Sequence, residues 1–247
     1  MIIEQSMHAG WLSNTWLVAD EPGGHAVLVD TGGPPEPILR KIEALRLTVT
    51  HALCTHHHVD HIENNALFRK RTGCRIAGHA AERSLFGELD LELTGGESLT
   101  CGKLSIRPIH IPGHTLGQLA FVVNDEAVFT GDTLFRGSVG GTVAPGHTTF
   151  EDIRRSIMDV LMALPKEMAV YPGHTEATTI GAEWRTNPFI RAWRGADRVK
   201  EARCSVRGAP ATLLLRAGDY DGGTKCWVRF DEGGTEDIVP GSAVRDL

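Results

Sequence analysis

The sequence predicts a mixed α/β fold followed by a small all-β module, and three observations support this prediction. In residues 15–45, two short apolar runs precede a stretch with helical periodicity. Residues 104–171 repeat the order of strands before a helix, and residues 200–247 alternate short strand-like runs with Asp-Gly and Gly-Gly turns. We therefore expect a main domain over residues 1–195 and a small SH3-like β module over residues 200–247.

Turn residues and periodicity define the elements of the first half. Residues 15–19 and 26–30 are predicted strands, and a Gly-Gly-Pro-Pro turn then leads into a helix. The apolar face of this helix consists of Ile38, Leu39, Ile42 and Leu45. Residues 47–55 are a predicted buried strand, and a helix from His61 onward ends at Gly73. The residues between this strand and helix form a strand-to-helix loop.

The second half has a similar rhythm. Residues 104–111 are a predicted strand, and residues 119–130 a hairpin that turns at Asn-Asp. Thr148 and Glu151 are spaced as a capping box for the helix that follows, and residues 168–171 give one more strand. Within the C-terminal module, the predicted strands are residues 211–216, 225–230 and 236–239.

The composition is that of an ordinary globular protein. The chain has 247 residues, of which 41% are hydrophobic and 23% charged, and its net charge is -6. This negative charge argues against binding to a nucleic-acid backbone, and no apolar run approaches the roughly 20 residues that a membrane span needs. Residues 1–16 show no secretory signal. We therefore expect a cytoplasmic protein with no nucleic-acid or membrane partner.

The five cysteines include no Cys-x-x-Cys pair. Their odd number and wide spacing favour reduced thiols over disulfides or a thiolate metal site. Cys54, on a predicted buried strand, is interpreted as a small apolar core residue rather than a nucleophile.

Histidines and aspartates gather where predicted strands end. Four candidate ligands lie within six residues of the strand-to-helix loop, namely His56, His58, Asp60 and His61. Three more follow apolar runs, adjoin a glycine and lie at predicted strand ends: His114, Asp132 and His174. Each alone could be an ordinary turn residue, but strand ends at one edge of a sheet converge. Imidazole and carboxylate ligands suit Zn, Fe or Mn, so the set predicts a metal site.

Four sequence blocks resemble the metallo-β-lactamase superfamily of hydrolases. They are Thr-His-His-His-Val-Asp-His at 55–61, Pro-Gly-His-Thr at 112–115, Phe-Thr-Gly-Asp-Thr-Leu-Phe at 129–135 and Tyr-Pro-Gly-His-Thr at 171–175. Within the superfamily, Gly-Asp-Thr-Leu-Phe and the later Asn-Pro-Phe resemble glyoxalase II and compact glyoxalase II-like thioesterases. The resemblance covers about the first 195 residues. It implies a four-layer αβ/βα sandwich with the metal site at one edge of two facing sheets.

The resemblance also implies a role for each candidate ligand. One metal would be held by His56, His58 and His114, and a second metal by Asp60, His61 and His174. Asp132 would bridge the two metals. The implied cofactors are two divalent ions, with Zn expected and Fe or Mn as alternatives. Asp60 and Asp132 would serve catalysis, because two such ions can activate a water between them and Asp60 could orient the resulting hydroxide.

The implied substrate is an activated acyl compound. A thiol leaving group can depart as thiolate, whereas an amine needs a proton donor that the sequence does not offer, so thioesters or lactones are favoured over amides. The chain has no counterpart of the helical C-terminal domain of larger glyoxalase II enzymes, which argues against glutathione as the carrier thiol. It also lacks a cysteine at the bridging position, where β-lactamases of the main zinc class have one. We expect a hydroxyacyl-thioester hydrolase.

Several alternatives stay open. His56, His114 and Asp132 alone could hold a single Fe(II) for persulfide dioxygenase-like chemistry, although Gly-His-Thr at 173–175 favours hydrolysis. A lactonase is a second alternative. A non-enzymatic alternative is an interaction protein whose C-terminal module presents aromatic side chains, namely Tyr220, Trp227 and Phe230. His57 alternates with two ligands and is expected to point away from the metals, toward a backbone or carboxylate partner. The oligomeric state is open.

Overall fold

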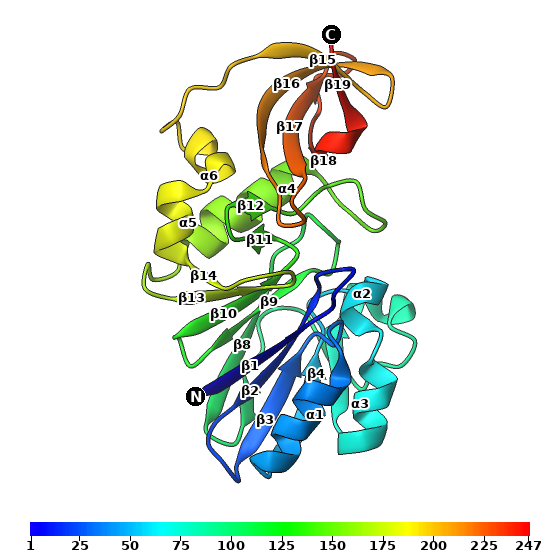
Figure 1. The fold of residues 1–247 in the computed structure, drawn as a ribbon, viewed down its shortest axis with the longest axis vertical. Coiled ribbons are helices and arrows are strands. Elements are labelled where there is room, and N and C mark those ends of the chain that lie inside the picture. The colour runs from blue at the N-terminus through cyan, green and yellow to red at the C-terminus, as the bar shows by residue number, and fades with distance from the viewer. The chain divides into compact units, whose positions relative to one another are not determined.

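The computed structural model describes residues 1–247, and the chain divides into two compact units (Figure 1). The first unit consists of residues 1–110, 117–131 and 170–175, and the second of residues 111–116, 132–169 and 176–247. The C-terminal strands therefore group with the helices that precede them. The boundary predicted near residue 195 is not the one by which these contacts divide the chain, and it stays a prediction.

One six-stranded sheet lies entirely in the first unit. Its strands follow the chain in order, β1-β2-β3-β4-β5-β6. The first three pair antiparallel and the rest pair parallel. Their bounds are β1 (Ile2–Met7), β2 (Asn14–Ala19), β3 (His25–Val29), β4 (Thr48–Leu53), β5 (Arg75–His79) and β6 (Leu91–Leu93). The parallel pairs need crossover segments, and the helices of this unit supply them.

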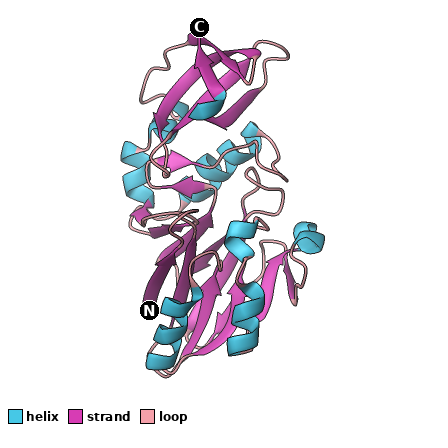
Figure 2. Ribbon diagram, turned by 45° about the vertical axis from the view of Figure 1, so that its right-hand side comes forward, coloured by secondary structure: helices cyan, strands magenta, loops and turns pink.

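The helices of the first unit are short and cover one face of this sheet (Figure 2). They are α1 (Pro35–Ala44), α2 (Val59–Ile62) and α3 (Asn65–Thr72), with a 3-10 turn at Ala80–Leu85. The single helix predicted from His61 to Gly73 is wrong in one respect, because residues 63–64 interrupt it. Its predicted end is confirmed, since Gly73 has a φ of 77° that a glycine adopts without strain.

The second sheet packs its apolar side chains against those of the first. The strands that belong to this unit are hydrogen-bonded in the order β13-β10-β9-β8-β7. They are β7 (Leu99–Cys101), β8 (Leu104–His110), β9 (Leu119–Val123), β10 (Ala127–Gly131) and β13 (Ala169–Pro172). Buried side chains from both sheets form one core, among them Trp16, Phe121 and Phe129. The predicted sandwich is confirmed, as is its hairpin, in which Asn124 and Asp125 have φ of 53° and 55°.

Helices and short strands begin the second unit. They are β11 (Leu134–Phe135), β12 (Ser138–Val139), α4 (Phe150–Arg155), a π turn (Ser156–Val160), a 3-10 turn (Leu161–Ala163), β14 (Thr178–Thr179), α5 (Ile180–Thr186) and α6 (Pro188–Trp193). The predicted capping box is wrong by one residue. Thr149, whose backbone is extended, caps α4 by accepting from the Asp152 backbone N–H at 3.1 Å. Thr148 and Glu151 have the same spacing, so the pattern alone could not separate the two pairs.

The last strands form an antiparallel sheet with its own core. They are β15 (Ala202–Val206), β16 (Ala209–Gly218), β17 (Thr224–Phe230), β18 (Glu236–Pro240) and β19 (Val244–Asp246), with a 3-10 turn at Gly241–Ala243. The sheet order is β18-β17-β16-β15-β19. All three strands predicted here are confirmed, and β15 and β19 are additional. No helix anywhere in the chain combines the length and the apolar character needed to cross a bilayer.

Candidate metal centre

Five of the seven predicted ligands meet in the first unit. The irregular segment after β4 carries His56 and His58, and the short helix α2 carries Asp60 and His61. His174 follows β13, and its backbone forms an isolated bridge with Ser13. His56 and His61 are fully buried and His174 nearly so, whereas His58 and Asp60 are half-buried. A mostly buried cluster with a partly exposed rim is typical of a site that a small molecule can reach.

Asp60, His61 and His174 bring their ligand atoms within 4.8 Å of one another. The two Nε2 atoms of His61 and His174 are 3.3 Å apart. One carboxylate oxygen of Asp60 lies 3.4 Å from the first of these nitrogens and 3.5 Å from the second. Three atoms able to bind one cation therefore surround a common point.

The tautomers of both histidines follow from their other ring nitrogens. His61 Nδ1 lies 3.0 Å from the buried Asp30 carboxylate, and His174 Nδ1 lies 3.0 Å from the backbone carbonyl of Trp11. Both partners accept hydrogen bonds only, so each Nδ1 must carry the proton. In the neutral rings, the two Nε2 lone pairs then face each other and a carboxylate. Because lone pairs repel without a cation or proton between them, this donor set fits a metal ion.

His56 is oriented in the same way and joins the cluster. Thr55 Oγ1 donates to the Asp30 carboxylate at 2.8 Å, so it accepts from His56 Nδ1 at 3.0 Å. His56 Nε2 is left with a lone pair and lies 3.0 Å from His58 Nδ1. The His56 and His61 ring centroids are 4.3 Å apart. The first unit thus places all five of its predicted ligands together.

The remaining two predicted ligands meet in the second unit. His114 Nε2 lies 3.6 Å from a carboxylate oxygen of Asp132, and both residues are less than 10% exposed. His114 Nδ1 donates to the backbone carbonyl of Gly141 at 3.0 Å. Its Nε2 therefore has a lone pair that faces a carboxylate, as in the first cluster. Each unit contributes a set of metal-binding atoms whose free lone pairs point at each other.

Asp30, which the sequence analysis did not select, connects several of the ligands. It follows β3 with a φ of 53°, a conformation that is rare outside glycine. Besides His61, it accepts from the Thr55 backbone N–H at 2.7 Å and from the Thr55 hydroxyl. Gly32 follows because the Asp60 carbonyl would lie 1.7 Å from a Cβ there. The signal was present, since Asp30 is another aspartate that ends a strand and precedes a glycine pair.

The partner of His57 confirms that this histidine points away from the ligand set. His57 Nδ1 lies 2.9 Å from Glu82, a residue with 2% exposure that also accepts from the Gly117 backbone N–H. Glu82, in the 3-10 turn that follows β5, could not be selected from the sequence because it lies 25 residues from His57 and outside every motif.

Replacing His57 with alanine is expected to leave the metal content unchanged and to lower the free energy of unfolding by about 1–3 kcal/mol, because the buried Glu82 carboxylate loses a partner. Urea denaturation and elemental analysis of the same samples measure both. The double variant His57→Ala, Glu82→Gln should recover part of the lost stability. Loss of metal from His57→Ala would instead assign this histidine to the metal site.

The cysteines take no part in the site. All five are buried free thiols. Burial raises the pKa of Cys54 far above that of an ordinary thiol, and the neighbouring Asp30 charge adds to this effect. A thiol that stays protonated is a poor nucleophile and a poor metal ligand. The interpretation of Cys54 as a core residue is confirmed.

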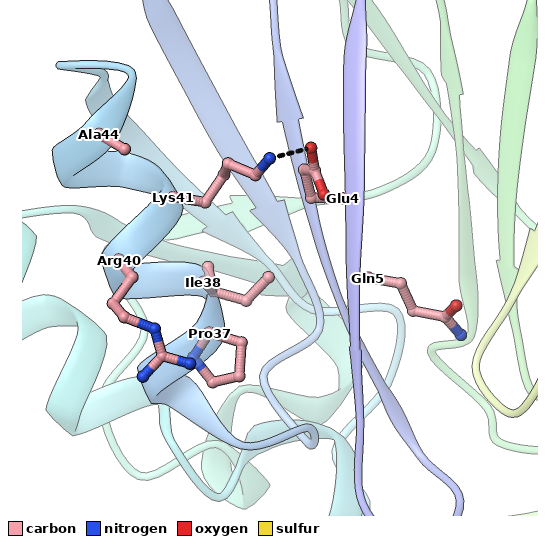
Figure 3. Close-up of a pocket in the computed structure, with 7 residues that line it drawn as sticks. All are labelled: Glu4, Gln5, Pro37, Ile38, Arg40, Lys41 and Ala44. Carbon is pink, nitrogen blue, oxygen red and sulfur yellow. Dashed lines mark ion pairs between the residues drawn. The ribbon is translucent and has the colours of Figure 1, made fainter.

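A surface groove in the first unit lies apart from the ligands. It has a volume of about 390 Å³ and runs between α1 and β1, where Lys41 Nζ and Glu4 Oε1 form an ion pair of 2.7 Å (Figure 3). No candidate ligand lines this groove, so it is not part of the predicted chemistry.

Comparison with known proteins identifies the family. Residues 9–174 match the Metallo-beta-lactamase superfamily. The chain belongs to this superfamily. The match covers the sandwich and six of the seven candidate ligands in sequence up to residue 173, with the seventh at its last position. Membership of the metallo-β-lactamase superfamily indicates a metal-dependent hydrolase, and the His and Asp clusters described above indicate divalent metals.

Curated relatives in the superfamily include one with a named activity. An uncharacterized protein from Mycobacterium tuberculosis is 37% identical over 216 residues, covering 74% of this chain and 95% of the relative. The hydroxyacylglutathione hydrolase GloC from Haemophilus influenzae is 31% identical over 188 residues, covering 68% of this chain and 88% of that enzyme. The chain thus spans most of the length of both relatives.

Solved structures of the superfamily show the same fold. BLEG-1 B3 metallo-beta-lactamase has a TM-score of 0.70 at 28% identity, covering 76% of this chain and 99% of that one. ETHE1 from Myxococcus xanthus has a TM-score of 0.69 at 30% identity, covering 78% and 85%. TTHA1623, solved in a di-iron-bound form, has a TM-score of 0.64 at 32% identity, covering 75% and 99%.

Proposed function

We propose that the chain is a binuclear metal-dependent thioesterase that hydrolyses a hydroxyacyl thioester. The observation that carries this proposal is the cluster of Asp60, His61 and His174, whose unprotonated nitrogens face a shared carboxylate. A mononuclear site built from His56, His114 and Asp132 would leave this second set of acceptors without a cation. The similarity to a hydroxyacylglutathione hydrolase supports the thioester as substrate class.

The ligand set divides between two ions. His56, His58 and His114 would hold the first ion; Asp60, His61 and His174 would hold the second, and Asp132 would bridge them. Zn is the expected metal, with Fe or Mn as alternatives, because the histidine and carboxylate ligands accept all three. The di-iron form of TTHA1623 supports a pair of ions for this fold.

The protein's own groups orient and hold the reactants. When bound, two divalent cations would lower the pKa of a shared water to about 7 and polarise the acyl carbonyl. The Asp60 side chain is 24% exposed while His61 is fully buried, so Asp60 can both bind and accept a hydrogen bond from the attacking water. Asp30 and the Trp11 carbonyl hold the His61 and His174 rings in place. The leaving thiol needs no proton donor, because its pKa is near about 8.5.

Elemental analysis of the purified chain, combined with a substrate panel, tests the proposal. The panel contains hydroxyacyl thioesters of several thiols, lactones and a thiol persulfide with an oxygen electrode. Two metal ions per chain with thioester turnover, both lost on chelation, are the expected result. One iron per chain with oxygen consumption would establish the dioxygenase alternative, and turnover confined to lactones would establish a lactonase. A chain that binds no metal would overturn the proposal.

The aromatic side chains of the C-terminal module argue for a structural role rather than a partner surface. Trp227 stacks on Phe150 of α4 with ring centroids 5.7 Å apart, and its indole N–H donates to Glu236 at 2.9 Å. Tyr220 packs on Phe135, with centroids 4.6 Å apart. Because these contacts lie within the second unit, we assign the module to the enzyme rather than to an external partner.

A further inference from the structure

A short segment of the second unit lies between two proposed ligands and the C-terminal strands. We call residues 138–143 the tether segment. The Gly141 carbonyl accepts from His114 Nδ1, and the Gly140 backbone N–H donates to the Thr133 carbonyl at 3.0 Å. A Cβ on Gly140 would lie 2.0 Å from the Asp132 carbonyl oxygen. The backbone of the tether segment therefore touches both His114 and the Asp132 residue.

The tether segment cannot fix its own conformation at this point. Gly140 and Gly141 have no side chains to pack or to bond, and glycine has more backbone freedom than any other residue. The position of the Gly141 carbonyl must therefore be set by whatever holds the residues on either side.

Thr142 is held by the strand β18 through three hydrogen bonds. Its backbone N–H donates to the Ile238 carbonyl at 3.0 Å, and its Oγ1 accepts from the Ile238 backbone N–H at 3.0 Å. The same hydroxyl donates to the Asp237 carboxylate at 2.9 Å. Thr142 is fully buried, so each of these bonds would be costly to lose.

The other end of the tether segment is held by a buried ion pair. Lys225 Nζ, on β17, donates to the Val139 carbonyl at 2.9 Å and lies 3.0 Å from the Asp219 carboxylate. Asp219 also accepts from the Ser138 hydroxyl at 2.8 Å. The Lys225 and Asp219 side chains are both less than 10% exposed. A buried lysine is stable only where its partners are in place, so this pair fixes one arrangement of the two segments.

From these contacts we infer that the C-terminal β module is a positioning device for the metal ligand His114. The module holds the tether segment at both ends, the tether segment places the Gly141 carbonyl, and this carbonyl fixes the orientation and tautomer of the His114 imidazole. The inference rests on the proposed function in one respect, namely that His114 is a metal ligand. It gives residues 200–247 a task at the active site without direct contact with substrate.

The test compares Thr142→Val with Thr142→Ser. Valine keeps the shape but removes the hydroxyl, so it leaves the Ile238 N–H and the Asp237 carboxylate without their partner, whereas serine keeps both bonds. Thr212→Val on β16 is the matched control, because it makes the same exchange in the module away from the tether segment. Each variant is loaded with Zn or Co(II), and the release of metal to a chelator and the Co(II) absorption spectrum are recorded.

We expect Thr142→Val to release one metal ion about 10–100-fold faster than the unchanged chain, as is typical when the partner of a metal-binding histidine is disturbed. Its Co(II) spectrum should change, while Thr142→Ser and Thr212→Val should match the unchanged chain. Equal release from folded Thr142→Val and the unchanged chain would overturn the inference and leave the proposed function standing. Absence of metal from the unchanged chain would overturn both. If Thr142→Val does not fold, Asp237→Ala and Asp237→Asn replace it, with accelerated release expected only from alanine.

Discussion

Replacing Asp132 with alanine is expected to leave at most one metal ion per chain and to lower thioester turnover by more than about 100-fold. A bridging carboxylate binds both ions, so its removal should exceed the roughly 10–100-fold loss that follows from disturbing a group behind a ligand. The His114 Nε2 lone pair, 3.6 Å from the Asp132 carboxylate, would also lose the acidic group it faces. Elemental analysis and steady-state kinetics at saturating metal measure the two effects.

A matched control for this change is Asp197→Ala. Asp197 pairs with Arg191 at 2.6 Å on the surface, and both side chains are well exposed. Its removal should leave metal content and turnover within error of the unchanged chain, because exposed ion pairs contribute little to stability. If Asp132→Ala kept two ions and full turnover, the assignment of the bridging position would be wrong.

Replacing Asp30 with asparagine should weaken metal binding by about 10–100-fold and lower the free energy of unfolding of the metal-free chain by about 3 kcal/mol. Asparagine has the same shape and also tolerates the left-handed backbone of this position. However, its amide N–H2 would replace the oxygen that accepts from Thr55 Oγ1 and His61 Nδ1. Two donors would then face a third.

Two measurements separate the effects of Asp30→Asn. Denaturation of the chelator-treated chain reports the loss of stability, and competition with a chelator reports the loss of metal affinity. Because Asp30 contacts no metal in the proposed arrangement, metal stoichiometry at saturation should stay at two ions. Wild-type affinity in Asp30→Asn would show that this carboxylate does not orient His61.

Local sequence patterns predicted the parts of the fold that local forces decide. Apolar alternation located β2, β3, β9 and β10, and the glycine after α3 marked its end. β1 was not predicted, because its exposed and half-buried residues give no clear alternation and its pairing with β2 decides its conformation. β15 and β19 escaped for the same reason, since each contains charged residues and is stabilised by a neighbour far along the chain.

The candidate site shows the same division. All seven ligand candidates could be selected because each ends an apolar run and adjoins a motif. The groups behind them could not, because Glu82, the Trp11 carbonyl and the Gly141 carbonyl meet their histidines only through the fold. Any backbone carbonyl is invisible to a search for residue types. The structure was therefore needed to assign the tautomers on which the metal fit depends.

Anomalous X-ray scattering from crystals of the metal-loaded chain tests the central claim most directly. The account predicts two peaks about 3.5–4 Å apart, one bound by Asp60, His61 and His174 and the other by His56, His58 and His114, with Asp132 at both. A single peak, or two peaks bound by other side chains, would contradict it.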